Sequence, residues 1–141
     1  MAEKQKGSAA KTPLPPVGVW APVLALGLLI PGGGHFLLKH RGRAALMAFS
    51  VTGMFVFGLL MRGSMFVPQT GDLLTTIMYC GGFVGNIATG LLFLLSTWLG
   101  YDQPYIAGHV RDYGSIFLVS AGLLNILGIV DAFELAIGKK T

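Results

Sequence analysis

Long apolar runs alternate with short polar stretches along this chain. The runs cover residues 17–38, 44–61, 73–99 and 113–137, and only the last one contains acidic residues. As helices, the runs would be about 27 Å long or longer, against about 30 Å for the hydrocarbon core of a bilayer. They lack the short alternating segments of a membrane β-barrel. The pattern predicts an all-α integral membrane protein, a bundle of four hydrophobic helical segments.

The first run is interrupted by residues that form helices poorly. It contains the sequence IPGGGHF, in which Pro31, Gly32, Gly33 and Gly34 are followed by His35. Proline lacks a backbone donor, glycine disfavours the helix, and an unpaired backbone group is costly in lipid. We therefore expect the first segment to be kinked or re-entrant at residues 31–34, with the glycines in close contact with another helix.

The polar flanks set the expected domain limits. Residues 1–16 are polar and hold three prolines, so they predict a disordered tail. Residues 17–138 should form one membrane helical domain, and residues 139–141 a basic C-terminal end. A glycine-rich stretch stands where a signal peptide would have its cleavage site, so the first segment is expected to be uncleaved.

The basic residues leave two topologies open. If all four segments cross, both termini share one side, and lysine and arginine divide six against four in favour of that side. If the first segment is re-entrant, the division is seven against three, and the C-terminus lies opposite the N-terminus. In either case the positive-inside rule places the N-terminus in the cytoplasm.

Composition supports membrane residence and excludes other classes. The chain of 141 residues is 53% hydrophobic and 11% charged, whereas soluble domains carry about 25% charged residues. The net charge of +4 sits in clusters beside the apolar runs. We therefore expect membrane lipids as partners, together with other membrane proteins or a second copy, and no nucleic acid.

The interrupted first segment resembles a known arrangement. Gly32-Gly33-Gly34-His35-Phe36, followed by Arg41-Gly42-Arg43 and an apolar helix, is similar to the PG-x-G-[His/Gln] hairpin of small bacterial membrane domains. Residues 121–133 also resemble the last helix of uncharacterised four-segment relatives of that hairpin. The resemblance implies a bacterial integral membrane protein of the inner membrane, without an assigned biochemical activity.

Several polar side chains within or beside the apolar runs are candidate functional residues. The intramembrane ones are His35, Asn86, Asn125 and Asp131. The asparagines are expected to join helices, or alternatively to line a solute path. Asp131 and Glu134 should form ion pairs at the interface, and Arg41 or Arg43 reaches Asp131 only if the fourth helix ends on their side.

Two further groups complete the candidate sites. Lys39, Arg41 and Arg43 predict contacts with lipid headgroups and an orientation signal. Gly81, Gly82 and Gly85 predict close helix packing. The single cysteine, Cys80, is expected to be a buried inert thiol.

The sequence carries no complete catalytic motif. It contains no nucleophile elbow, zinc-protease motif, phosphate-binding loop, dinucleotide fingerprint or CxxC pair. A non-enzymatic protein without a cofactor or metal is therefore expected, in the role of an accessory or scaffold subunit. Two alternatives remain: a small oligomeric transporter or channel lined by the intramembrane polar residues, and a subunit that ligates a haem or chlorophyll-like pigment through His35.

Overall fold

The computed structural model describes residues 13–104 and 108–139, and these residues form helices and no strand. The six helices are α1 (Val17–Leu29), α2 (Gly33–Leu37), α3 (Arg41–Leu60), α4 (Leu73–Ile87), α5 (Leu91–Trp98) and α6 (His109–Ala136). The all-helical prediction is confirmed, but the described chain has six helices rather than four. Both additional helices come from breaks within expected segments.

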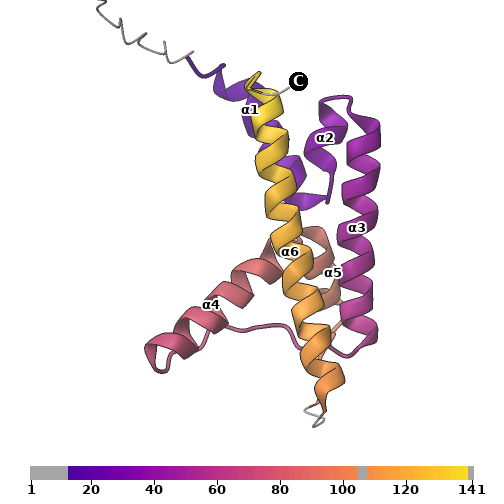
Figure 1. Cartoon of the computed structure of the whole chain (residues 1–141), viewed down its shortest axis with the longest axis vertical. Helices are drawn as coiled ribbons and strands as arrows, with labels where there is room; N and C mark the ends of the chain where they lie inside the picture. Colours follow the sequence, from indigo (N-terminus) through magenta and orange to yellow (C-terminus); the bar gives the residue numbers. More distant parts are fainter. Residues whose placement is uncertain (1–12, 105–107, 140–141) are drawn as a thin grey trace, which may run out of the picture.

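Two long helices form the frame of the molecule. α3 and α6 run side by side over most of its length (Figure 1). They enclose a core in which Val51, Phe55, Leu118 and Ala121 are buried. By length and composition, α3 and α6 are each suited to cross a membrane. The bent pair α4 and α5 would add a third span if it counted as one.

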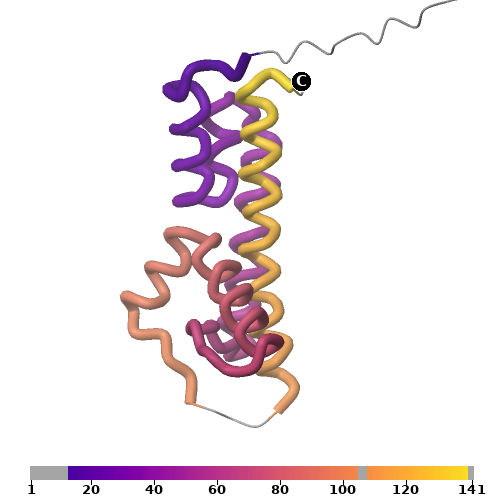
Figure 2. The backbone as a smooth tube through the Cα atoms, turned by 90° about the vertical axis from the view of Figure 1, so that its left-hand side faces the viewer, coloured from indigo at the N-terminus to yellow at the C-terminus, as the bar shows by residue number. Residues whose placement is uncertain are grey.

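The four short helices form two hairpins that approach from opposite ends. α1 and α2 lie beside one half of the frame, and α4 and α5 lie beside the other half (Figures 1 and 2). α1 and α4 are about 20 and 22 Å long, which is shorter than a bilayer core. The tips of the two hairpins meet at the middle of the molecule. We call residues 17–37 the first hairpin and residues 73–98 the second hairpin.

The second hairpin corrects the prediction of one continuous segment over residues 73–99. α4 and α5 are bent by 98° across a break at residues 88–90. Gly90 has φ of 59°, a left-handed conformation that other residues adopt only at a cost. The expected limits of two other segments shift too: α3 begins at Arg41 within the basic cluster, and α6 begins at His109 within the expected polar loop.

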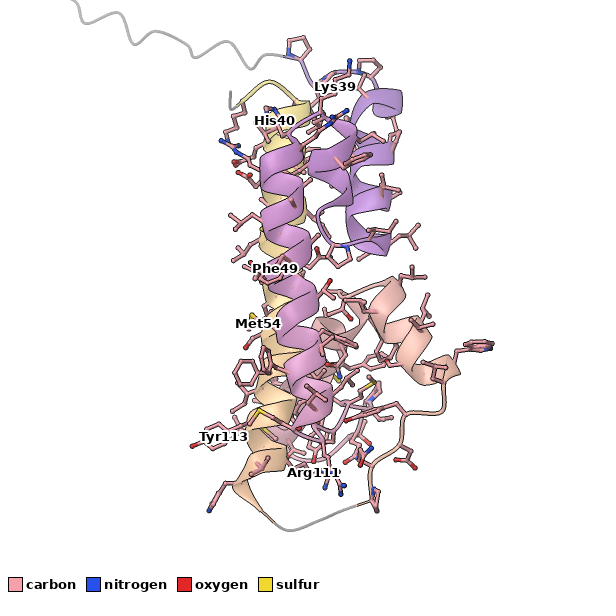
Figure 3. All side chains as sticks on the ribbon, turned by 90° about the vertical axis from the view of Figure 1, so that its right-hand side faces the viewer. Lys39, His40, Phe49, Met54, Arg111 and Tyr113 are labelled. Carbon is pink, nitrogen blue, oxygen red and sulfur yellow. The ribbon has the colours of Figure 1, made fainter. Side chains whose placement is uncertain are left out.

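Both described ends of the chain lie at the same end of the molecule. Pro13, Leu14 and Pro15 line a cavity together with Gly138 and Lys139. Lys39 lies at this end, which we call the upper end, and Arg111 lies at the opposite, lower end (Figure 3). The predicted disordered tail lies largely outside the described residues, as does part of the basic C-terminal end. Residues 13–16 lead directly into α1.

Candidate functional site

The break of the first hairpin follows from Pro31 and the glycines after it. Pro31 has no N–H, so the carbonyl of Gly27, four residues earlier, loses its helical partner. Gly32 then turns the chain with φ of 79°, and a Cβ on it would lie within 3 Å of the Ala44 carbonyl oxygen. Only glycine fits both the conformation and the space at this position.

The break of the second hairpin frees a carbonyl in the same way. In a continuous helix the N–H of Leu92 would donate to the Ala88 carbonyl. Here it donates instead to the Thr89 carbonyl at 3.4 Å, so the Ala88 carbonyl loses its helical donor. Gly90 lies against the first hairpin, where a Cβ would clash with the backbone carbonyl of Leu28. The tips of the two hairpins are therefore in backbone contact.

Asn125 of α6 joins the two broken helices. Its side-chain nitrogen donates to the Gly27 carbonyl at 3.0 Å and to the Ala88 carbonyl at 2.8 Å. Both of these carbonyls lose their helical partner at a break. Asn125 is 1% exposed, so these hydrogen bonds are shielded from solvent. One amide thus caps both hairpins, which is the kind of contact by which polar side chains join membrane helices.

Asn86 lies one turn before the second break and has a different environment. It is 1% exposed, and neither its amide nitrogen nor its amide oxygen has a hydrogen-bond partner among the described residues. A buried unpaired amide costs roughly 1–3 kcal/mol. Thr89, also fully buried, donates to the Asn86 backbone carbonyl at 2.7 Å. The region where the hairpins meet therefore combines a satisfied amide with an unsatisfied one.

His35 and Asp131 pair at the upper end. The Nε2 atom of His35 lies 2.9 Å from the Oδ2 atom of Asp131, and His35 is only 2% exposed. The guanidinium of Arg43 lies 3.8 Å from the same oxygen. α6 therefore ends on the side of the basic cluster, which was the condition for this pairing. The pair fixes the returning arm of the first hairpin against α6.

The lower end is held by hydroxyl groups. Ser64 and Ser115 are joined at 3.0 Å, and the Tyr101 hydroxyl donates to the Gly63 carbonyl at 2.9 Å. Burial raises the pKa of Tyr101, against the lowering effect of the nearby Arg111 and Arg62. Ser64, Phe83, Tyr101 and other residues line a cavity of about 300 Å³ here. Phe83 lies one turn before Asn86 in α4.

The glycines predicted to pack helices do so unequally. A Cβ on Gly82 would meet the ring of Phe66, and Gly85 lies against the backbone of Gly122 in α6. Gly81 has open space around it. The close contact between α4 and α6 therefore depends on Gly85 and Gly122 rather than on the pair Gly81 and Gly85.

The remaining predicted residues lie at the surface or at the upper end. Lys39 and Arg41 are exposed, and Lys139 lies 3.8 Å from Glu134. Cys80 is exposed, so the prediction of a buried thiol is wrong: its position on α4 faces away from the rest of the chain. Within the described ranges, no group of three potential metal ligands occurs.

Some residues of this region were not predicted from sequence. Thr89, Gly90, Gly122 and Ser115 all take part in contacts between distant elements. The only local signal was Gly90 itself, a poor helix former inside an apolar run. Gly122 and Ser115 carry no local signal, since small residues are frequent throughout this chain.

Comparison with known proteins adds one finding. The model of a family of unknown function, DUF6677, matches residues 22–141. The chain belongs to the DUF6677 family. The matched region includes the break of the first hairpin, the second hairpin and all of α6. Neither the curated proteins nor the solved structures compared with the chain gave a match.

Proposed function

We propose that this member of the DUF6677 family is a small membrane transport protein for an uncharged, hydrogen-bonding solute. The observation that carries the proposal is the meeting of two opposed, broken helical hairpins beside the unpaired amide of Asn86. Broken helices are costly in lipid and occur there where they are buried in protein or line a cavity. In transporters such breaks mark the binding site near the middle of the bilayer.

The chemistry of the hairpin tips indicates the class of solute. The groups near the contact are two amides, a hydroxyl and backbone carbonyls, from Asn86, Asn125, Thr89 and the broken helix ends. None of these groups carries a formal charge, and the ionisable pair of His35 and Asp131 lies toward the upper end. A neutral donor-acceptor solute would pair with Asn86 without burying an unpaired charge. We propose that the solute enters from the lower cavity, because Phe83 on its wall lies one turn from Asn86 in α4.

Osmotic measurements on reconstituted vesicles test this proposal. Vesicles with and without the protein would be mixed with excess urea or glycerol, and their re-swelling followed by light scattering. Faster re-swelling with the protein supports transport. Asn86→Leu should return the rate to that of empty vesicles, because it removes the unpaired amide. Thr52→Val is the matched control on the outer face of α3. Equal rates for protein-containing and empty vesicles would contradict the proposal.

The arrangement of the ends supports a definite orientation. If both hairpins are re-entrant, Lys39, Arg41, Arg43 and Lys139 share the upper side, and Arg62 and Arg111 the lower side. Four further lysines adjoin the upper end in sequence, at positions 4, 6, 11 and 140. The balance of eight against two supports the proposal that both termini lie in the cytoplasm.

Thiol labelling of intact cells tests the orientation. In a Cys80→Ser background, Arg62→Cys should react with an impermeant maleimide, and Lys139→Cys should react only after the cells are opened. The reverse pattern would contradict the proposed orientation, and labelling of both sites in intact cells would contradict the re-entrant arrangement.

An accessory subunit is the second candidate, and the outward course of α4 favours it. The first half of α4 projects away from the other helices (Figure 1). Leu73, Leu74 and Ile77 on it are 79%, 74% and 61% exposed. A partner membrane protein would pack on this surface. Purification in mild detergent through a C-terminal tag, with mass spectrometry, should then recover a stoichiometric partner that Ile77→Trp releases. Recovery of the chain alone would remove this candidate.

Pigment ligation through His35 receives no support from the geometry. The Nε2 atom of His35 is engaged by Asp131, and the side chain is 2% exposed. An absorption spectrum of the same purified sample tests this alternative directly, since a bound haem or chlorophyll-like pigment absorbs visible light.

A further inference from the structure

An apolar groove separates the first hairpin from α3 in the upper half of the molecule. Its volume is about 430 Å³, within the range of about 300–1,000 Å³ typical of small-molecule sites. Ile30, Pro31 and Gly32 lie at its inner end, at the tip of the hairpin. Its walls are formed by Leu26, Gly33, Phe36, Ala44, Ala45 and Ala48. The alanines of α3 keep the groove open, because larger side chains at these positions would fill it.

One charged residue stands at the upper mouth of this groove. Arg41, the first residue of α3, lines the groove and is exposed. Lys39, two residues before it, is also exposed. Neither residue forms an ion pair with another described residue, whereas Arg43 is directed to Asp131. The mouth therefore presents uncompensated positive charge above an apolar interior.

The groove continues along the outer face of α3. Ala45 and Ala48 also line a second, shallower depression that extends past Phe49, Thr52 and Gly53 to Leu60. The distance from Arg41 to Leu60 is about 28 Å along the helix. A long apolar chain that enters at Arg41 thus has a continuous surface to follow, over roughly the thickness of a bilayer core.

We propose that this groove is a specific site for an anionic phospholipid. The phosphate-containing headgroup binds Arg41 and Lys39, and an acyl chain lies between the first hairpin and α3. Charge complementarity selects the anionic headgroup, and the apolar walls select the chain. Basic pockets between membrane helices on the cytoplasmic side bind such headgroups. This inference does not depend on the transport proposal, because none of the residues that line the groove belongs to the second hairpin or to α6.

A second copy of the chain fits this groove less well than a lipid. Most homodimers are symmetric and bring the same surface of both copies together. A symmetric contact through this groove would bring the two Arg41 guanidinium groups toward each other, and like charges in contact are unfavourable.

Native mass spectrometry of the full chain tests the proposal. The protein, in detergent, would be titrated with phosphatidylglycerol and with phosphatidylcholine of the same chain length. We expect stronger binding of phosphatidylglycerol, and a loss of about fivefold on Arg41→Gln, because one basic residue near the surface contributes at this level. Arg62→Gln at the lower end is the matched charge control and should bind as the wild type does.

A second variant separates the groove from the charge. Ala45→Phe keeps Arg41 and fills the groove, so it should weaken phosphatidylglycerol binding as well. Equal binding of the two lipids, or equal loss in Arg41→Gln and Arg62→Gln, would overturn the proposal, because binding would then follow general charge. A dimer that Ala45→Phe disrupts, without any lipid preference, would overturn it in favour of a second copy. Lipid loss without loss of solute flux would leave the transport proposal standing.

Discussion

The two hairpins are both interrupted helices beside the same frame of α3 and α6, but they are built by different means. The first is broken by a proline and three consecutive glycines, and its returning arm is held by the buried pair of His35 and Asp131. The second is broken at a single glycine, Gly90, and packs on α6 through Gly85 and Gly122. The first break is thus specified by local sequence, whereas the second depends on what the chain meets in space.

The largest expected effect distinguishes tertiary contact from local strain. Gly90 and Gly100 both have positive φ. A Cβ on Gly90 would clash with the Leu28 carbonyl, whereas a Cβ on Gly100 would have no other atom within 4 Å. Gly90→Ala should lower the free energy of unfolding by more than about 3 kcal/mol, and Gly100→Ala by only about 1–2 kcal/mol. Denaturant titration in detergent micelles measures both. Equal losses would show that the hairpin tips are not in contact.

The two asparagines provide the next comparison. Asn125→Leu leaves the carbonyls of Gly27 and Ala88 without a donor, and should cost about 1–3 kcal/mol. Asn86→Leu removes an amide that has no described partner, so stability should be unchanged or higher. The same titration measures both variants. A large loss for Asn86→Leu would mean that its amide has a structural role.

A smaller effect should be confined to the first hairpin. Asp131→Ala removes the contact to His35 and should cost about 1 kcal/mol. Hydrogen exchange should then accelerate in residues 33–38 and remain unchanged in α4 and α5, which do not touch this pair. Faster exchange in both hairpins would show that they open as one unit. Asp131→Asn, which retains a hydrogen-bonding side chain, is the control.

The smallest effect concerns the lower end at alkaline pH. Burial raises the pKa of Tyr101 above the usual 10.0, so the folded protein holds this proton more tightly than the unfolded chain does. The resulting contribution to stability is complete below pH 10.0 and is lost as the pH rises through the raised pKa. Ultraviolet titration should show one tyrosine that ionises late and is absent in Tyr101→Phe. Normal titration of all tyrosines would contradict the burial of this hydroxyl.

The helical class and the first break were predictable because they depend on local composition. Long apolar runs can satisfy their backbone groups only as helices in lipid, and a proline followed by glycines interrupts a helix wherever it stands. The third run contains no proline, so its sequence predicts one long helix. The bend at Gly90 is stabilised by the Asn125 amide, which donates to the Ala88 carbonyl, and only glycine fits against the Leu28 carbonyl.

Contacts between residues far apart in the sequence could not be predicted from local patterns. His35 and Asp131 are 96 residues apart, and their contact requires α6 to end beside the basic cluster. The two topologies considered for the chain each had one feature of the observed fold. One had a hairpin in the first segment and the other had both termini together. The break between α4 and α5, which the sequence did not predict, explains how the chain can have both features.

The position of Asn125 in the chain also determines the order in which the fold can be completed. The residues that fix both hairpins, Asn125, Gly122 and Asp131, all belong to the last helix. During synthesis both hairpins are made before any of these residues exists. The carbonyls of Gly27 and Ala88 therefore lack the Asn125 donor until α6 has been made and packs against the hairpins. α6, which is made after both hairpins, is the segment that closes the structure, and a chain cut short before it would leave both hairpins unfixed.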